Sequence, residues 1–188
     1  MPVGISREKA LGLLEEHIEN PNMIKHCLAS EAVLGALAEH LDEDREKWSM
    51  AGLLHDLDIE MTNADLNVHG RETVRILEQQ GVDPEIIEAI GVHNERSAGE
   101  KRSKPFHHAL AAGETVTGLI IATALVYPDK KLAGVKPKSI LKRMKEKAFA
   151  ASVDRDIIRE CEQIPIPLNE FALISLQAMQ SISPELGL

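Results

Sequence analysis

The sequence contains few aromatic residues and few cysteines. Phe, Trp and Tyr make up 3% of the 188 residues, whereas hydrophobic residues of all kinds make up 44%. The core is therefore expected to be aliphatic. The two cysteines, Cys27 and Cys161, do not form a C-x-x-C pair, which argues against a disulfide framework and against a thiolate zinc site.

The sequence also lacks a signal peptide and any uninterrupted apolar stretch of about 18 residues. Its formal net charge is −9, which argues against broad binding to nucleic acids or to anionic membranes as the main activity. A small phosphorylated substrate is compatible with this charge, because local charge decides such binding. We expect a soluble, cytoplasmic protein with reduced cysteines, and the sequence leaves homo-oligomerisation open.

Strand-like alternation is missing too, since apolar residues recur at helical spacing along the whole chain. A chain of 188 residues fits one domain, so we expect residues 1–188 to form a single all-α domain. The polar residues 94–103 are predicted to form a loop. Helices are predicted over residues 7–19, 23–40, 69–80, 84–93, 105–126 and 167–181, with others that begin at Asp42 or Asp44, at Pro137 and after Asp154.

The most informative feature is the adjacent pair His55-Asp56, which follows the apolar residues 50–54. Burying a carboxylate beside an imidazole is costly unless a positive charge compensates. A divalent metal ion is the compensation that we expect, with His26 as a further ligand. Neighbouring residues on a helix point about 100° apart, so His55 and Asp56 share one ion only if it lies between their directions. Alternatively, Asp56 bridges two ions.

A fourth ligand is expected from the long predicted helix over residues 105–126. Glu114 is the only acidic residue within the apolar segment 111–121. A lone carboxylate in such surroundings needs a partner. We expect Glu114 to bind the ion; the alternative is a neutral acid whose pKa is raised by burial.

This set of residues resembles the HD-domain superfamily of metal-dependent phosphohydrolases. The family pattern is a first histidine, then an adjacent His-Asp pair, then a distant aspartate. His26 matches the first histidine, His55-Asp56 matches the pair, and Glu114 stands where the family has aspartate. The resemblance implies a helical bundle with a metal site between core helices. It covers about residues 23–126, and residues 127–188 are expected to form a C-terminal helical extension packed on this core.

Some members of the superfamily bind a second ion through additional histidines. His69 and the residues after it are similar to the helix that supplies one such histidine. The segment His93-Asn94-Glu95 looks like the His-His-Glu segment of the dinuclear phosphodiesterases, with Asn94 replacing the second histidine. The resemblance thus implies one divalent ion and leaves room for two. These ligand types do not distinguish Fe, Mn, Zn, Ni, Co and Mg.

His107 lies seven residues before Glu114 and is therefore on the same face of the predicted helix. It could contact a metal ligand or the substrate, although ordinary packing is the simpler interpretation. His69, His93 and Asn94 could likewise bind a second ion or hydrogen-bond to the ligands of the first.

The expected reaction is hydrolysis of a phosphate ester by a metal-activated water. Asp56 or Asp58 could orient that water or relay its proton, and Asp58 could equally form a hydrogen bond that orients a ligand. Cations for binding the phosphate are expected on the segment after His93. These candidates are Arg96, Lys101, Arg102 and Lys104.

Two other functions fit the same residues. Because Glu114 and Asn94 depart from the family pattern, the protein could be a metal- or nucleotide-binding regulatory module with weakened catalysis. A di-iron oxygenase, of the kind found among a few relatives in the superfamily, would require the additional histidines to bind a second iron.

Overall fold

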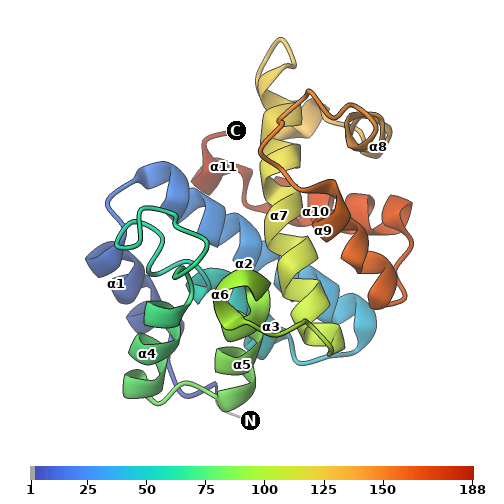
Figure 1. Cartoon of the computed structure of the whole chain (residues 1–188). Helices are drawn as coiled ribbons and strands as arrows, with labels where there is room; N and C mark the ends of the chain where they lie inside the picture. Colours follow the sequence, from blue (N-terminus) through green and yellow to red (C-terminus); the bar gives the residue numbers. More distant parts are fainter. Residues whose placement is uncertain (1–2) are drawn as a thin grey trace.

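The computed structural model describes residues 3–188, and these residues form helices joined by turns, without a strand. This confirms the predicted all-α fold (Figure 1). The helices are α1 (Arg7–His17), α2 (Pro21–Leu41), α3 (Arg45–Leu54), α4 (Arg71–Gln80), α5 (Pro84–His93), α6 (Glu95–Ala98), α7 (Pro105–Leu125), α8 (Pro137–Met144), α9 (Arg155–Ile158), α10 (Leu168–Ser181) and α11 (Ser183–Leu186), with the 3-10 helices η1 (Leu132–Gly134) and η2 (Arg159–Gln163).

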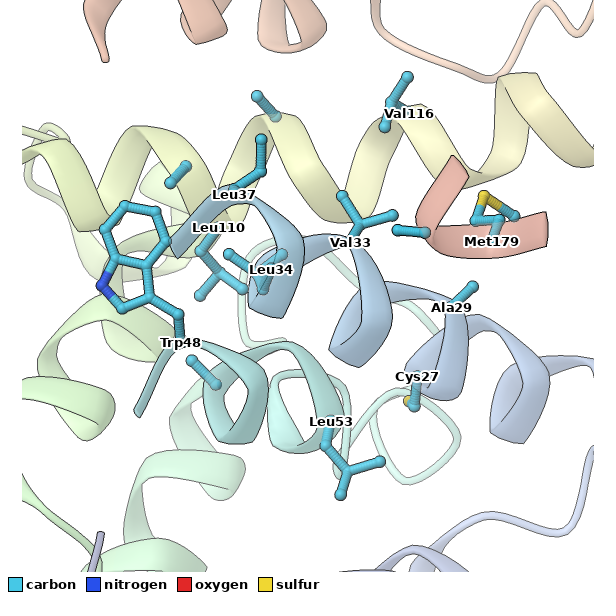
Figure 2. Close-up of a cluster of buried hydrophobic side chains, with 14 of the residues drawn as sticks. Cys27, Ala29, Val33, Leu34, Leu37, Trp48, Leu53, Leu110, Val116 and Met179 are labelled. Atoms are coloured by element: carbon cyan, nitrogen blue, oxygen red, sulfur yellow. The ribbon is translucent and has the colours of Figure 1, made fainter. Parts of the chain in front are cut away.

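The core is centred on α2, which packs between α3 and α7. Figure 2 shows Val33, Leu34 and Leu37 of α2 in this region, close to Leu110 of α7. All four side chains are completely buried. As expected from the composition, the core is largely aliphatic, and Phe171 is the only aromatic residue among its largest fully buried side chains.

Two glycines allow these helices to approach closely. A Cβ atom on Gly113 of α7 would lie 2.6 Å from Leu34 Cδ2, and one on Gly52 of α3 would lie 2.5 Å from the carbonyl oxygen of Ser30 on α2. A larger residue at Gly52 would force α2 and α3 apart, because it would meet backbone, whereas one at Gly113 would require the Leu34 side chain to move. Gly52 matters most for function, because it lies three residues before His55.

The observed helix boundaries follow from capping residues. Helix α2 begins at Pro21 rather than at residue 23, because Asn20 accepts a hydrogen bond from the backbone N–H of Asn22 and proline suits the first turn. Asp44 accepts a hydrogen bond from the N–H of Lys47 and begins α3. Asp42 instead ends α2 in the left-handed conformation, at φ 58°.

Two predictions for residues 69–103 were wrong in detail. Helix α4 begins at Arg71, not at His69, because Gly70 adopts φ 98° and turns the chain just before the helix. The segment predicted as a loop, 94–103, contains the short helix α6, which is capped by the side chain of Asn94. The first difference places His69 in the turn before α4 rather than inside a regular helix.

The C-terminal part of the chain packs on the core. Helix α10 contacts α2 and α8, whereas α9 and η2 contact α7 (Figure 1). Among residues 3–188, α7 is the one helix long and apolar enough to cross a membrane, but 61% of its apolar window is buried inside the fold. Core helices of soluble proteins meet the same length and composition criteria.

Candidate metal centre

His26 and His55 face each other from α2 and the end of α3. His55 Nδ1 donates to the carbonyl oxygen of Gly52 over 2.9 Å. His26 Nδ1 lies 3.0 Å from the hydroxyl oxygen of Thr117, whose own hydrogen is donated to the Glu114 carbonyl over 2.7 Å. That hydroxyl therefore accepts from His26. Both imidazoles are thus held with a proton on Nδ1, which leaves Nε2 to bind a ligand.

His69 and His93 are held in the same manner. His93, the last residue of α5, donates from Nδ1 to the carbonyl oxygen of Ile90 over 2.5 Å. His69, in the turn before α4, donates from Nδ1 to Asp58 Oδ1 over 2.6 Å. Protein oxygen atoms behind the rings therefore fix all four imidazoles and direct each Nε2 toward the same interior point.

The Nε2 atoms converge on the carboxylate of Asp56. His26 and His55 bring their Nε2 atoms within 3.1 Å of each other, and His69 and His93 do the same. Asp56 Oδ1 lies 3.0 Å from His69 Nε2 and 3.4 Å from His55 Nε2, while Oδ2 lies 3.6 Å from His26 Nε2. Asp56 thus stands between two pairs of imidazoles.

Two sets of ligand atoms can be distinguished around Asp56. One consists of His26, His55 and Glu114; the other consists of Asp56, His69 and His93. Within each set, the ligand atoms lie within 4.8 Å of one another. Nitrogen and carboxylate oxygen donors in this arrangement suit first-row divalent ions. The donors fit the divalent ion that the sequence predicts, with room for one ion at each set.

Electrostatics at the first set favour a cation. Burial lowers the pKa of His55 to about 3 and lowers that of His26, so both rings are neutral near pH 7. Each ring carries its proton on Nδ1, and two Nε2 lone pairs then point at each other across 3.1 Å. This contact is repulsive by itself, and a cation between the nitrogens would make it attractive.

The site shifts the pKa values of Glu114, Asp56 and His69 in different directions. Desolvation raises the pKa of Glu114 to about 8, although its side chain keeps 20% exposure. Burial opposes ionisation of Asp56, but His55 and the other imidazoles hold its pKa well below the usual range. Burial lowers the pKa of His69, yet Asp56 and Asp58 outweigh this effect and raise it to about 9. A bound divalent ion would take the place of that proton.

Asp58 lies behind His69 rather than at the centre. Its completely buried carboxylate accepts hydrogen bonds from the backbone N–H groups of Gly70, Glu72 and Thr73 as well as from His69. The first turn of α4 is thereby capped, because N–H groups at a helix start need acceptors. Asp58 holds the His69 ring and the beginning of α4 together.

Asn94 also contacts backbone rather than the centre. Its side-chain amide donates to the carbonyl oxygens of Leu66 and His69 over 2.9 and 3.1 Å. Its oxygen accepts from the N–H of Arg96 over 3.3 Å. Ser97, which the sequence did not single out, donates from Oγ to the same His69 carbonyl over 2.6 Å. Both residues therefore anchor the turn that carries His69.

His107 is not brought to this centre. Its Nε2 lies 3.6 Å from Glu88 Oε1, and it lines a separate pocket together with Trp48 and Phe106, whose rings stack at 5.1 Å. The seven-residue spacing from Glu114 gave the correct helix face, but two helical turns cover about 10 Å along the axis.

A pocket of about 450 Å³ opens onto the centre. Asp56, His69, His93 and Glu114 line it, and apolar side chains including Ile157 form part of its wall. A larger groove of about 700 Å³ lies between α2, α3 and α10, but none of the histidines lines it. The pocket of about 450 Å³ is therefore the one through which a substrate would reach the candidate ligands.

The four predicted phosphate-binding cations lie in different environments. Arg96 and Arg102 line the pocket, and Arg96 is exposed. Arg102 is only 6% exposed and pairs with Glu160. Lys101 and Lys104 do not line the pocket: Lys101 pairs with Glu95, which does line it, and Lys104 pairs with Glu88.

Sequence reasoning missed Thr117 and the backbone carbonyls that orient the rings. Thr117 follows Glu114 by three residues on α7, so its proximity to a predicted ligand was a usable signal. The carbonyl oxygens of Gly52 and Ile90 each lie three residues before a histidine. They became identifiable only once the helix ends at His55 and His93 were known.

The comparisons with known proteins agree with this geometry. The family model described as HD domain matches residues 23–134. No curated protein and no solved structure gave a significant match. The match covers more than half of the chain and includes every residue of both candidate ligand sets. This chain belongs to the HD-domain family.

Proposed function

We propose that this protein is a metal-dependent phosphohydrolase that acts on a small phosphorylated substrate, a nucleotide or another phosphate ester. The observation that carries the proposal is the convergence of four Nδ1-anchored imidazoles on Asp56 at the base of a pocket. Membership in the HD-domain family, which consists mostly of hydrolases, supports it.

A divalent ion in this centre supplies a Lewis acid for the phosphoryl oxygens and lowers the pKa of the attacking water. His26, His55 and Glu114 would hold one ion, and Asp56 with the remaining histidines would hold a second. Asp56 reaches the pocket and is placed to orient the attacking water. Asp58 acts through His69, since its oxygens are occupied by N–H donors.

Arg96 is the residue that we assign to the substrate phosphate. Its side chain is exposed and lines the pocket. The guanidinium of Arg102 is already bound by Glu160 and by backbone carbonyls. A guanidinium binds phosphate oxygens through paired N–H donors. Arg96 therefore orients the ester so that phosphorus faces the metal centre.

Purified protein stripped by a chelator and reloaded separately with Mn²⁺, Fe²⁺, Co²⁺, Ni²⁺, Zn²⁺ or Mg²⁺ tests this function. Phosphate release from nucleotides and simple phosphomonoesters should depend on metal and should be lost in His55→Ala. His40→Ala is the matched control, because His40 is 38% exposed on the helix that carries His26. Inactivity of every metal-loaded form on the whole panel would overturn the proposal.

Two further measurements on the same metal-loaded protein separate the alternatives. A regulatory module would bind a nucleotide tightly without releasing phosphate, which calorimetry on the metal-loaded protein detects. A di-iron oxygenase would consume oxygen and would stop under anaerobic conditions. Phosphate release by a hydrolase continues without oxygen.

A further inference from the structure

Arg102 is a buried cation beside the metal centre. Its Nη1 donates to the carbonyl oxygen of His93 over 2.8 Å and lies 3.4 Å from that of Val92. These carbonyls end α5, where intrahelical partners run out and a cation is favoured. The guanidinium therefore holds the last turn of α5, which carries the His93 ring, through hydrogen bonds to its backbone.

Glu160 holds this guanidinium in place. Its carboxylate accepts from Arg102 Nη2 over 2.6 Å and from Nε over 2.8 Å, an arrangement with two parallel hydrogen bonds. It also accepts from Nδ1 of His108 on α7 over 2.7 Å. One carboxylate thus connects α7, the segment before it and the end of α5.

Glu160 lies in η2, outside the residues that the family model matches. The segment just before it belongs to the substrate pocket, because Asp154 and Ile157 line that pocket. Helix α9 and η2 both pack against α7 (Figure 1). The C-terminal part of the chain therefore reaches the surroundings of the metal centre twice, through the contact of Glu160 with Arg102 and through the pocket wall.

We propose that Glu160 and Arg102 are positioning residues for the ion bound by Asp56, His69 and His93. Glu160 fixes the Arg102 guanidinium, and the guanidinium fixes the backbone of His93 and hence the direction of its Nε2. The inference rests on the proposed metal centre. It does not depend on which reaction the centre performs, because its test measures ion binding without substrate.

The test is Co²⁺ binding to the full-length apoprotein, measured by calorimetry and by the visible absorption of the bound ion. Wild type should bind two ions. Glu160→Gln, which keeps the shape but removes the charge, should bind the first ion normally and the second about 10- to 100-fold more weakly, as changes behind metal-ligating histidines do. Glu162→Gln is the matched control, since Glu162 is a 53%-exposed carboxylate in the same 3-10 helix.

Arg102→Lys provides a second variant, because a lysine keeps the charge but cannot contact Glu160 and the His93 carbonyl together. Arg102→Lys should weaken the binding of the same ion. It therefore tests the inference even if Glu160→Gln does not fold. His93→Ala should abolish binding of that ion. The double variant His93→Ala, Glu160→Gln should bind the other ion as tightly as His93→Ala does.

The inference would be overturned if Glu160→Gln and Arg102→Lys bound the second ion with wild-type affinity. It would also be overturned if they lowered the affinity for both ions equally. Uptake of a single ion by the wild type would also overturn it. Failure of phosphate hydrolysis with this pattern of ion binding intact would instead remove only the proposed function.

Discussion

His26 Nε2 and His55 Nε2 lie 3.1 Å apart although they belong to different helices, α2 and the end of α3. The contact depends on how closely those helices pack. A Cβ atom on Gly52 would clash with the Ser30 carbonyl oxygen, and Gly52 also supplies the carbonyl that orients His55. Gly52 therefore determines both how closely α2 and α3 pack and how His55 is oriented.

Gly52→Ala is expected to damage both stability and ion binding. The added Cβ would lie 2.5 Å from the Ser30 oxygen, so α2 and α3 must separate at a cost of about 1–3 kcal/mol. Urea unfolding of the metal-free protein measures this cost. Gly12→Ala is the control, since nothing lies within 4 Å of a Cβ there, and it should stabilise helix α1 by about 0.5–1 kcal/mol. Equal stability of Gly52→Ala and wild type would show that the packing is looser than described.

Thr117→Val is expected to lower the affinity for the ion held by His26 and His55 about tenfold or more, because His26 Nδ1 loses its acceptor. Thr117→Ser keeps the hydroxyl and should restore wild-type affinity. The matched control is Thr123→Val, which removes a buried hydroxyl bonded to the Leu119 carbonyl on the same helix. Co²⁺ titration reports all three variants. Equal weakening by Thr123→Val would mean that the effect is general destabilisation.

Arg96→Ala should raise KM for the phosphorylated substrate about tenfold or more and leave the bound metal unchanged. A hydrogen bond to a charged group contributes about 1.5–3 kcal/mol, which corresponds to that factor. Lys104→Ala serves as the control, because Lys104 is 56% exposed and pairs with Glu88, and neither residue lines the pocket. Steady-state kinetics at fixed metal concentration distinguish them. An unchanged KM in Arg96→Ala would move the phosphate site elsewhere.

The cysteines should not react in the folded protein. Cys27 and Cys161 are completely buried, and burial raises the pKa of the Cys161 thiol to about 12. At pH 8 only about one Cys161 in ten thousand would then carry the reactive thiolate. A thiol reagent such as dithionitrobenzoate should label both cysteines only after unfolding. Rapid labelling of the native protein at pH 8 would contradict the described core.

Local patterns in the sequence predicted most of the helices and the ligands that lie on them. Helical spacing of apolar residues and capping residues such as Asp44 are local properties, so α2, α5 and α7 were found with small errors at their ends. The four-residue helix α6 is too short to show periodicity. Gly70 was placed inside a helix predicted to begin at His69, because its left-handed conformation depends on a contact with Asp58, 12 positions earlier in the chain.

Contacts between distant segments were the limit of prediction. The pairing of Arg102 with Glu160 joins residues 58 positions apart, and no local pattern connects them. Arg102 therefore looked like a free cation for substrate. His107 shared a helix face with Glu114, yet the distance along the helix axis put it in another pocket.

The most direct measurement is an anomalous difference map from crystals soaked in Mn²⁺ or Co²⁺, collected at the absorption edge of that metal. The account predicts a peak about 2.0–2.2 Å from the Nε2 atoms of His26 and His55, at the distance typical of metal–imidazole bonds. Asp56 should contact that ion or bridge it to a second peak beside His69 and His93. A saturated crystal with no peak among these four imidazoles would contradict the metal centre itself.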